Sequence, residues 1–223
     1  MIFGLILVLA VAVLDWIAVA QGWKKVEIIA KPATMAALFL IFALVGWFSS
    51  LPLIFFGAGL LLSLAGDVFL MFSDRWFIPG LAAFLLAHVA YIVGFNLPLP
   101  DVSSVWSVSI AIILALTAGR VLRRIVAALK GKGLQRLVGP VVLYGMVITI
   151  MLLSAMLTVF NPEWDSIPAL LASLGAFLFY FSDIILAWNK FVAPIKNGRL
   201  VNMVSYHLGQ IALVAGALIQ FTK

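Results

Sequence analysis

Apolar residues run through this chain in long blocks, and the polar segments between the blocks are short. A helix needs about 20 predominantly apolar residues to cross a bilayer. Blocks of this kind predict eight transmembrane helices, at residues 2–21, 33–49, 52–72, 79–97, 104–119, 138–160, 166–188 and 201–222. The alternating segments of a membrane β-barrel are absent from the sequence. The pattern therefore predicts an all-α, polytopic membrane helical bundle, with residues 1–223 forming one domain.

The amino-acid composition agrees with the hydropathy pattern and excludes several classes of protein and of functional site. Hydrophobic residues make up 65% of the 223 residues and charged residues 10%, and the mean hydropathy is +1.25. An ordinary soluble domain carries about 25% charged residues, so a soluble globular enzyme is excluded. The chain has no cysteine, which rules out thiol nucleophiles, disulfides and cysteine-bound metals.

The basic residues lie almost entirely on one side of the predicted membrane. Thirteen of the fourteen Lys and Arg residues fall in the loops after the first, third, fifth and seventh helices, and the last is Lys223. The other loops carry Asp101, Glu163 and Asp165 instead. Because cytoplasmic loops are enriched in Lys and Arg, we expect an integral protein of a plasma or bacterial inner membrane with both termini outside the cytoplasm.

The most basic stretch, residues 120–137, has two interpretations. It is either a charged loop that anchors the topology or an amphipathic helix on the membrane surface, with Ile125 and Leu129 among the residues that face lipid. Its charges are not interleaved with aromatic residues, so we expect no nucleic-acid partner.

Two stretches of the chain repeat the same order of residue types. Residues 66–72 and 182–188 both read small, Asp, apolar, apolar, Leu, apolar, aromatic, and each precedes a helix that contains one of the two histidines. A shift of four helices preserves the direction of the chain across the membrane. The match is consistent with a parallel repeat of four plus four helices, with halves 1–100 and 101–223.

Polar side chains inside the predicted helices, or at their cytoplasmic edge as for Lys31, gather between the midplane and the cytoplasmic side. Such residues are costly in a membrane, which makes each ionisable one a candidate for function. The candidates are the acids Asp15, Asp67 and Asp183, the bases Lys31, His88 and His207, and the tyrosines Tyr91, Tyr144 and Tyr206. The outer halves of the predicted helices contain no charged residue or histidine. This asymmetry predicts a site that opens to the inner leaflet or the cytosol.

Asp67 and Asp183 are the strongest candidates for catalysis because they occupy matching positions in the two similar stretches. Burial and a neighbouring negative charge both oppose ionisation, so one carboxyl group of such a pair can stay protonated while the other is ionised. This division suits general acid and base catalysis. The sequence has no G-x-S-x-G elbow, P-loop or dinucleotide fingerprint. A zinc site of both histidines and both aspartates is allowed by ligand type, but no characteristic spacing supports it, and we expect no metal or cofactor.

Several short segments, in the same order along the chain, resemble the YhhN family of integral membrane proteins. They are Lys31-Pro32, Gly66-Asp67-Val68-Phe69-Leu70, Ala87-His88-Val89-Ala90-Tyr91, Phe181-Ser182-Asp183 and the last helix with Tyr206. This family contains lysoplasmalogenases, which hydrolyse the vinyl ether bond of lysoplasmalogens to a fatty aldehyde and glycerophosphoethanolamine or glycerophosphocholine. The resemblance implies a membrane-embedded ether hydrolase of plasmalogen metabolism, with a vinyl-ether lysophospholipid as substrate and membrane lipids around it.

The resemblance also implies that Asp67 and Asp183 are the catalytic pair. One would protonate the vinyl ether, and the other would stabilise the resulting cation and activate water, a division of labour similar to that of glycosidases. Substrate or water would be held by the other polar side chains, Lys31, His88, Tyr91, Tyr144, Tyr206 and His207. Two other classes stay open: a proton-coupled transporter of small molecules or lipids, and a non-catalytic lipid-binding protein whose polar residues join helices.

Overall fold

Eight long helices form most of the protein in the computed structural model, which describes residues 2–72, 74–97, 99 and 105–222. They are α1 (Ile2–Gln21), α2 (Lys24–Gly46), α3 (Leu51–Met71), α4 (Phe77–Phe95), α5 (Val105–Gly131), α6 (Val138–Leu157), α7 (Ser166–Ala187) and α8 (Gly198–Phe221). Short helical segments occur at Asp74–Trp76, Gln135–Leu137, Thr158–Phe160 and, with π geometry, Trp188–Val192. No strand occurs among the described residues, and all eight long helices are apolar enough to cross a membrane. The predicted all-α polytopic bundle is confirmed.

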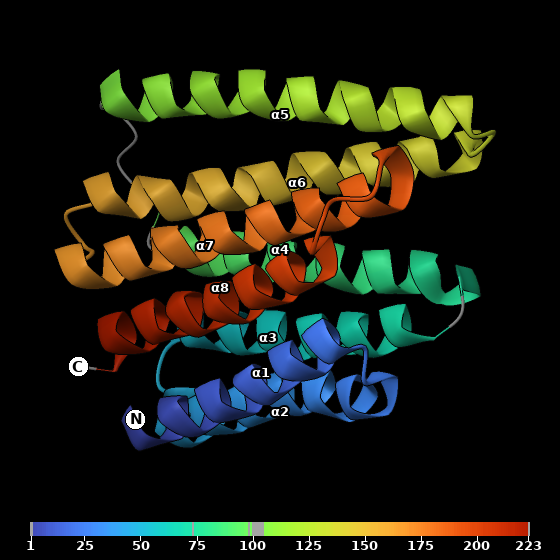
Figure 1. The fold of residues 1–223 in the computed structure, drawn as a ribbon. Coiled ribbons are helices and arrows are strands. Elements are labelled where there is room, and N and C mark those ends of the chain that lie inside the picture. The colour runs from blue at the N-terminus through green and yellow to red at the C-terminus, as the bar shows by residue number, and fades with distance from the viewer. Residues whose placement is uncertain (1, 73, 98, 100–104, 223) are drawn as a thin grey trace.

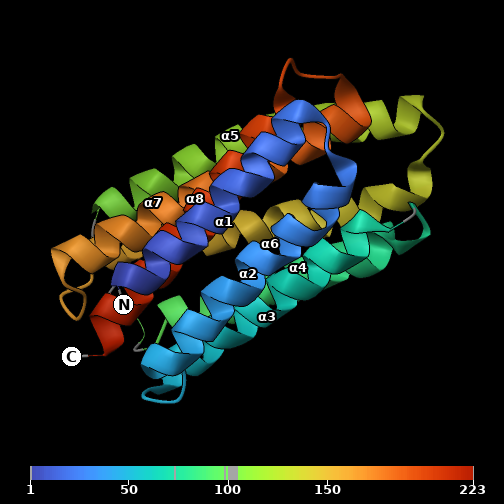
Figure 2. The same ribbon diagram turned by 60° about the horizontal axis from the view of Figure 1, so that its bottom comes forward.

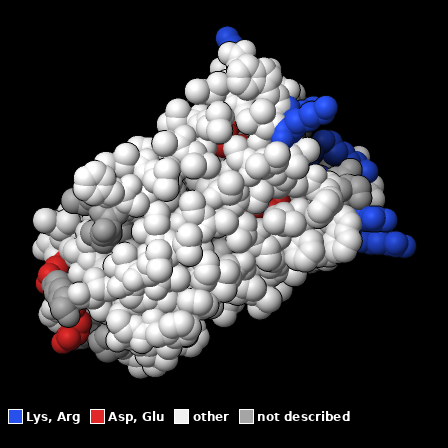
Figure 3. Space-filling view, turned by 90° about the horizontal axis from the view of Figure 1, so that it is seen from below, with Lys and Arg blue, Asp and Glu red and all other residues white. Residues whose placement is uncertain are grey.

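The helices run alternately in opposite directions, so both ends of the chain lie at the same end of the bundle (Figure 1). α3 packs along α4, α7 packs along α8, and α5 lies at the edge of the bundle beside α6 (Figure 1, Figure 2). On the face drawn in Figure 3, Lys and Arg side chains gather mainly at one end of the bundle, and acidic side chains lie at the other end and in recesses between the two. Asp101 and Lys223, which entered the charge prediction, lie outside the described residues.

Two helices, α2 and α5, extend far beyond their predicted ends, because a helix continues into charged sequence after it leaves the hydrocarbon. α2 begins at Lys24 rather than at residue 33, and Pro32 lies inside it. α5 continues to Gly131 instead of ending at residue 119; its predicted start at residue 104 lies outside the described part. The extension of α5 is rich in Ala, Leu, Arg and Lys, which are strong helix formers. Hydropathy marks where a helix meets the membrane surface, not where the helix ends.

The second interpretation of residues 120–137, a separate surface helix with Ile125 and Leu129 facing lipid, is wrong. Residues 120–131 are the last turns of α5, and both side chains are buried. They pack with Val141 of α6 and Phe191 of the π segment in a small apolar cluster. This cluster holds the basic end of α5 against the neighbouring helices.

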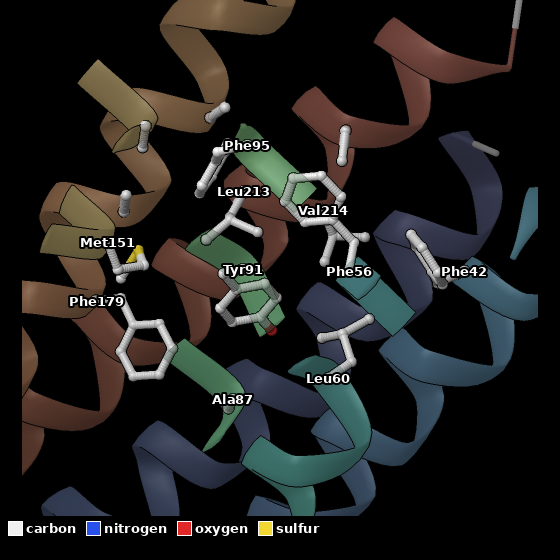
Figure 4. Close-up of a cluster of buried hydrophobic side chains, with 14 of the residues drawn as sticks. Phe42, Phe56, Leu60, Ala87, Tyr91, Phe95, Met151, Phe179, Leu213 and Val214 are labelled. Atoms are coloured by element: carbon white, nitrogen blue, oxygen red, sulfur yellow. The ribbon is translucent and has the colours of Figure 1, made fainter. Parts of the chain in front are cut away.

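The main hydrophobic core combines aliphatic side chains with aromatic ones such as Tyr91 and Phe179 (Figure 4). α7 and α8 approach closely because glycine lies between them: a Cβ at Gly209 would be 2.8 Å from the backbone nitrogen of Phe179. Close approach through small residues is typical of membrane helices. This tight pair fixes the relative positions of Asp183 on α7 and Tyr206 on α8.

Candidate active site

A cavity of about 420 Å³ lies among the helices at the basic end of the bundle. Its walls come from every long helix except α1, and they are mostly apolar. The volume is within the range of pockets that hold small organic ligands. Five of the eight predicted site residues line it: Lys31, Asp67, Tyr144, Asp183 and Tyr206. The structure therefore brings both candidate catalytic acids to one cavity, from α3 and α7.

Asp67 is almost completely buried and accepts a different donor on each carboxylate oxygen. Lys31 Nζ lies 2.9 Å from Oδ1, and the Tyr206 hydroxyl donates to Oδ2 at 2.6 Å. Lys31 reaches Asp67 because α2 starts at Lys24, which places Lys31 inside the bundle rather than at its surface. These two contacts fix the orientation of the Asp67 carboxylate, because each of its oxygens has its own donor.

Asp183 is 13% exposed and has other partners. The Tyr144 hydroxyl donates to Oδ2, and His88 Nε2 lies 2.9 Å from the same hydroxyl oxygen. Since the hydrogen of Tyr144 points to Asp183, His88 donates from Nε2 in this arrangement. Ser182 Oγ is 3.5 Å from Oδ1 and also donates to the Phe179 carbonyl at 2.7 Å. Among the residues that the structure describes, Oδ1 is therefore the oxygen of Asp183 without a close donor.

His88 does not line the cavity but lies behind Tyr144. Its ring is fully buried, its Nε2 is 3.6 Å from Asp183 Oδ2, and its Nδ1 has no hydrogen-bond partner among the described residues. His88, Tyr144 and Asp183 form a continuous hydrogen-bonded chain that ends in the cavity. His88 is therefore connected to the cavity only through Tyr144 and Asp183.

Tyr91 and His207 were also predicted to contact substrate, and the structure gives neither of them a place in the cavity wall. The Tyr91 hydroxyl donates to Gln210 at 2.9 Å inside the core. His207 Nδ1 accepts a hydrogen bond from Trp16 at 3.1 Å, and Asp15 Oδ2 lies 4.0 Å from the same nitrogen. Both residues therefore lie inside the bundle but outside the cavity wall.

An ion pair at the exposed end of the cavity was not predicted. Nη2 of Arg199 donates to both carboxylate oxygens of Glu27, at 2.6 and 2.8 Å, and both residues line the cavity. The available signal was weak: Glu27 and Lys31 are four residues apart, which puts them on one helix face. No local pattern connects Glu27 with Arg199, which is 172 positions away.

The four residues that could have formed a zinc site do not converge. His207 faces Trp16, away from both cavity aspartates. Among the residues that the structure describes, no group of three or more His, Cys, Asp or Glu side chains has the arrangement of a metal site.

Eight apolar helices, seven of which contribute to a cavity that contains Asp67 and Asp183, define a polytopic helical membrane protein with a carboxylate site between its helices. The YhhN family matches residues 26–217, and the chain belongs to this family. No solved structure matches the chain significantly.

Several curated relatives are similar over much of the chain. Mouse lysoplasmalogenase TMEM86B is 30% identical over 210 residues, which cover 91% of this chain and 80% of the relative. Human lysoplasmalogenase TMEM86B is 29% identical over 160 residues, or 71% of this chain and 61% of the relative. Human lysoplasmalogenase TMEM86A is 29% identical over 164 residues, or 72% and 63%. The chain thus spans about three fifths of the length of the two human relatives.

Proposed function

We propose that this chain is a lysoplasmalogenase-like hydrolase, which cleaves the vinyl ether bond of a lysoplasmalogen to a fatty aldehyde and glycerophosphoethanolamine or glycerophosphocholine. The observation that carries the proposal is that Asp67 and Asp183 line one cavity but have different hydrogen-bond partners. The names of the similar mouse and human proteins support it. The apolar walls of the cavity suit an alkenyl chain.

Hydrolysis of a vinyl ether begins with transfer of a proton to its β-carbon. In the proposed mechanism Asp183 gives this proton from Oδ1, the oxygen without a close donor. The π electrons of the double bond form the new C–H bond, and positive charge develops on the ether carbon and oxygen. The Tyr144 hydroxyl, itself held by His88, donates to Oδ2, which leaves Oδ1 to face the substrate.

Asp67 acts as the carboxylate of the pair. Lys31 and Tyr206 hold it in place, and its negative charge stabilises the oxocarbenium ion that develops nearby. Water adds to the cationic carbon and gives a proton to Asp67, which forms a hemiacetal. The hydroxyl proton of the hemiacetal then passes to the ether oxygen as the C–O bond breaks, releasing aldehyde and the glycerol hydroxyl. Transfer of the proton from Asp67 to Asp183 through water restores the starting state.

The remaining predicted site residues have supporting functions in this proposal. Tyr144 and Tyr206 orient the two carboxyl groups, and Lys31 acts through Asp67 rather than on a lipid phosphate. Tyr91 and His207 stabilise the helix packing instead of contacting substrate.

The proposed orientation puts the basic end of the bundle in the cytoplasm and both termini outside it, in a plasma membrane or bacterial inner membrane. The distribution of Lys and Arg supports this orientation (Figure 3). A one-chain lipid would then enter from the inner leaflet, with its head group at the exposed end of the cavity. Residues 1–223 act as a single domain in this account.

Aldehyde release from lysoplasmenylethanolamine by the purified protein tests the proposed function. We expect release with and without EDTA, and in water labelled with heavy oxygen we expect no label in the glycerol product, because water attacks the alkenyl carbon. Label in the glycerol hydroxyl would overturn the mechanism, and activity lost in EDTA but restored by a divalent cation would replace it with a metal site. A folded sample that releases no aldehyde would overturn the function, and substrate counterflow in sealed vesicles would then favour a transporter.

A further inference from the structure

The exposed end of the cavity carries charged side chains that the proposed chemistry does not use. Lys24, Glu27 and Arg199 line this end. One guanidinium nitrogen of Arg199, Nη2, makes both hydrogen bonds to Glu27, so Nε and Nη1 lie outside the pair. The side chain of Arg199 is 61% exposed and that of Glu27 is 19% exposed. A ligand at the membrane surface can therefore reach both members of the pair.

We propose that Glu27 and Arg199 bind the zwitterionic head group of the substrate, with the phosphate on Arg199 and the ammonium on Glu27; this rests on the proposed function. Guanidinium groups bind phosphate oxygens through parallel N–H donors. A carboxylate accepts hydrogen bonds from a primary ammonium in the same way. A phosphoethanolamine group carries both complementary charges, so it can exchange partners with the ion pair and leave no charge unpaired.

The spacing along α2 matches the length of the substrate. Glu27 and Lys31 lie on one face of the helix, one turn and about 6 Å apart along its axis, and Lys31 contacts Asp67. In a lysoplasmalogen the phosphorus and the vinyl ether oxygen are joined through the glycerol carbons by five bonds, a comparable span. A head group held by Glu27 and Arg199 therefore brings the vinyl ether to the level of the two aspartates.

The ion pair also discriminates between head groups. A phosphate monoester binds Arg199 but supplies no cation for Glu27. The negative charges of the phosphate and of Glu27 then repel each other. A choline group satisfies the charge of Glu27 but has no N–H to donate. The order of affinity is therefore phosphoethanolamine first, phosphocholine second and unsubstituted phosphate last, and Glu27 sets this order.

KM values for three vinyl-ether lysolipids, with phosphoethanolamine, phosphocholine or unsubstituted phosphate as head group, test the proposal. Glu27→Gln is expected to raise KM for the phosphoethanolamine lipid about tenfold, because the ammonium group loses one charge-assisted hydrogen bond at a partly exposed site. It is expected to leave KM for the phosphate lipid unchanged or lower. Arg199→Gln is expected to raise KM for all three lipids, with little change in kcat in either variant. Equal effects of Glu27→Gln on the phosphoethanolamine and phosphate lipids would overturn the proposal.

Matched controls remove the same charges elsewhere. Lys25→Gln and Glu163→Gln change exposed residues outside the cavity and are expected to leave every KM unchanged. Because Arg199 is 61% exposed and the pair lies at the surface of the bundle, both test variants are expected to keep the unfolding stability of the wild type to within about 1 kcal/mol, the usual worth of a surface ion pair.

Calorimetric binding of the two head-group compounds, glycerophosphoethanolamine and glycerol phosphate, separates this proposal from the proposed function. A wild-type protein that releases no aldehyde but prefers glycerophosphoethanolamine, with the preference lost in Glu27→Gln, would support the head-group site while the reaction fails. Equal affinity of the wild type for both compounds would overturn the head-group site, whether or not aldehyde is released.

Discussion

Lys31→Met is expected to destabilise the protein strongly, because it removes the cation from a buried carboxyl group. Nζ and Oδ1 are 2.9 Å apart, and the side chains of Lys31 and Asp67 are 11% and 1% exposed. At this distance, with an effective dielectric constant of about 20, the attraction between the two charges is about 6 kcal/mol. Breaking a buried pair by removing one partner costs about 3–5 kcal/mol in measured cases, since desolvation offsets part of the attraction.

Proton uptake sets an upper limit on this loss. An aspartic acid of ordinary strength costs about 4 kcal/mol to protonate at pH 7, so leaving Asp67 unpaired cannot cost more than that. The limit falls by about 1.4 kcal/mol for each unit by which the pH is lowered. We therefore expect Lys31→Met to lower the free energy of unfolding by about 3–4 kcal/mol at pH 7, and by less at pH 5.

The double variant Lys31→Met/Asp67→Asn removes both charges and is expected to recover most of the lost stability, because no charge is left unpaired. Unfolding of each variant by SDS in mixed micelles, followed by circular dichroism, measures these free energies. A Lys31→Met protein as stable as the wild type, or a double variant less stable than Lys31→Met alone, would refute the reasoning.

Three further substitutions separate chemistry from packing. Tyr144→Phe is expected to lower kcat for aldehyde release about 10- to 100-fold, the worth of a hydrogen bond to a charged group; Tyr180→Phe in the same cavity wall is the control, and equal losses would contradict the assignment. Tyr91→Phe breaks a buried hydrogen bond and is expected to lower the free energy of unfolding by about 1–3 kcal/mol with little change in kcat; a large kcat loss would return Tyr91 to the site. Gly209→Ala is expected to reduce the thermal stability and yield of folded protein. Its control is Gly119→Ala, where a Cβ meets nothing within 4 Å; this change is expected to be neutral or stabilising by up to about 1 kcal/mol. Equal effects of the two substitutions would contradict the close α7–α8 packing.

The number of helices could be predicted because the membrane imposes a strong constraint. Every spanning helix needs about 20 apolar residues, and this signal is visible in one sequence. The presence of Asp67 and Asp183 in one cavity could also be expected, since both occur at matching positions near the same end of their helices. The boundaries of α2 and α5 were missed because hydropathy reports contact with lipid and not helical hydrogen bonding.

The direction in which each polar side chain points was harder to predict from the sequence. Tyr206 and His207 are neighbours on α8, about 100° apart around the helix axis. Tyr206 faces Asp67 and His207 faces Trp16, which depends on where α1 and α3 pack rather than on α8 itself. The contact between Glu27 and Arg199 likewise arises from tertiary packing.

Aldehyde release by the Asp67→Asn and Asp183→Asn variants tests the central claim most directly. Asparagine keeps the size and polarity of the side chain but can neither give a carboxylic proton nor accept one from water. Each variant is expected to lose about 100- to 10,000-fold in kcat on lysoplasmenylethanolamine. The Lys31→Met/Asp67→Asn protein is expected to lose as much. Because this double variant is expected to remain stable, its loss of activity would come from the missing carboxyl group and not from unfolding. Turnover at the wild-type rate by both folded single variants would contradict the two-aspartate account.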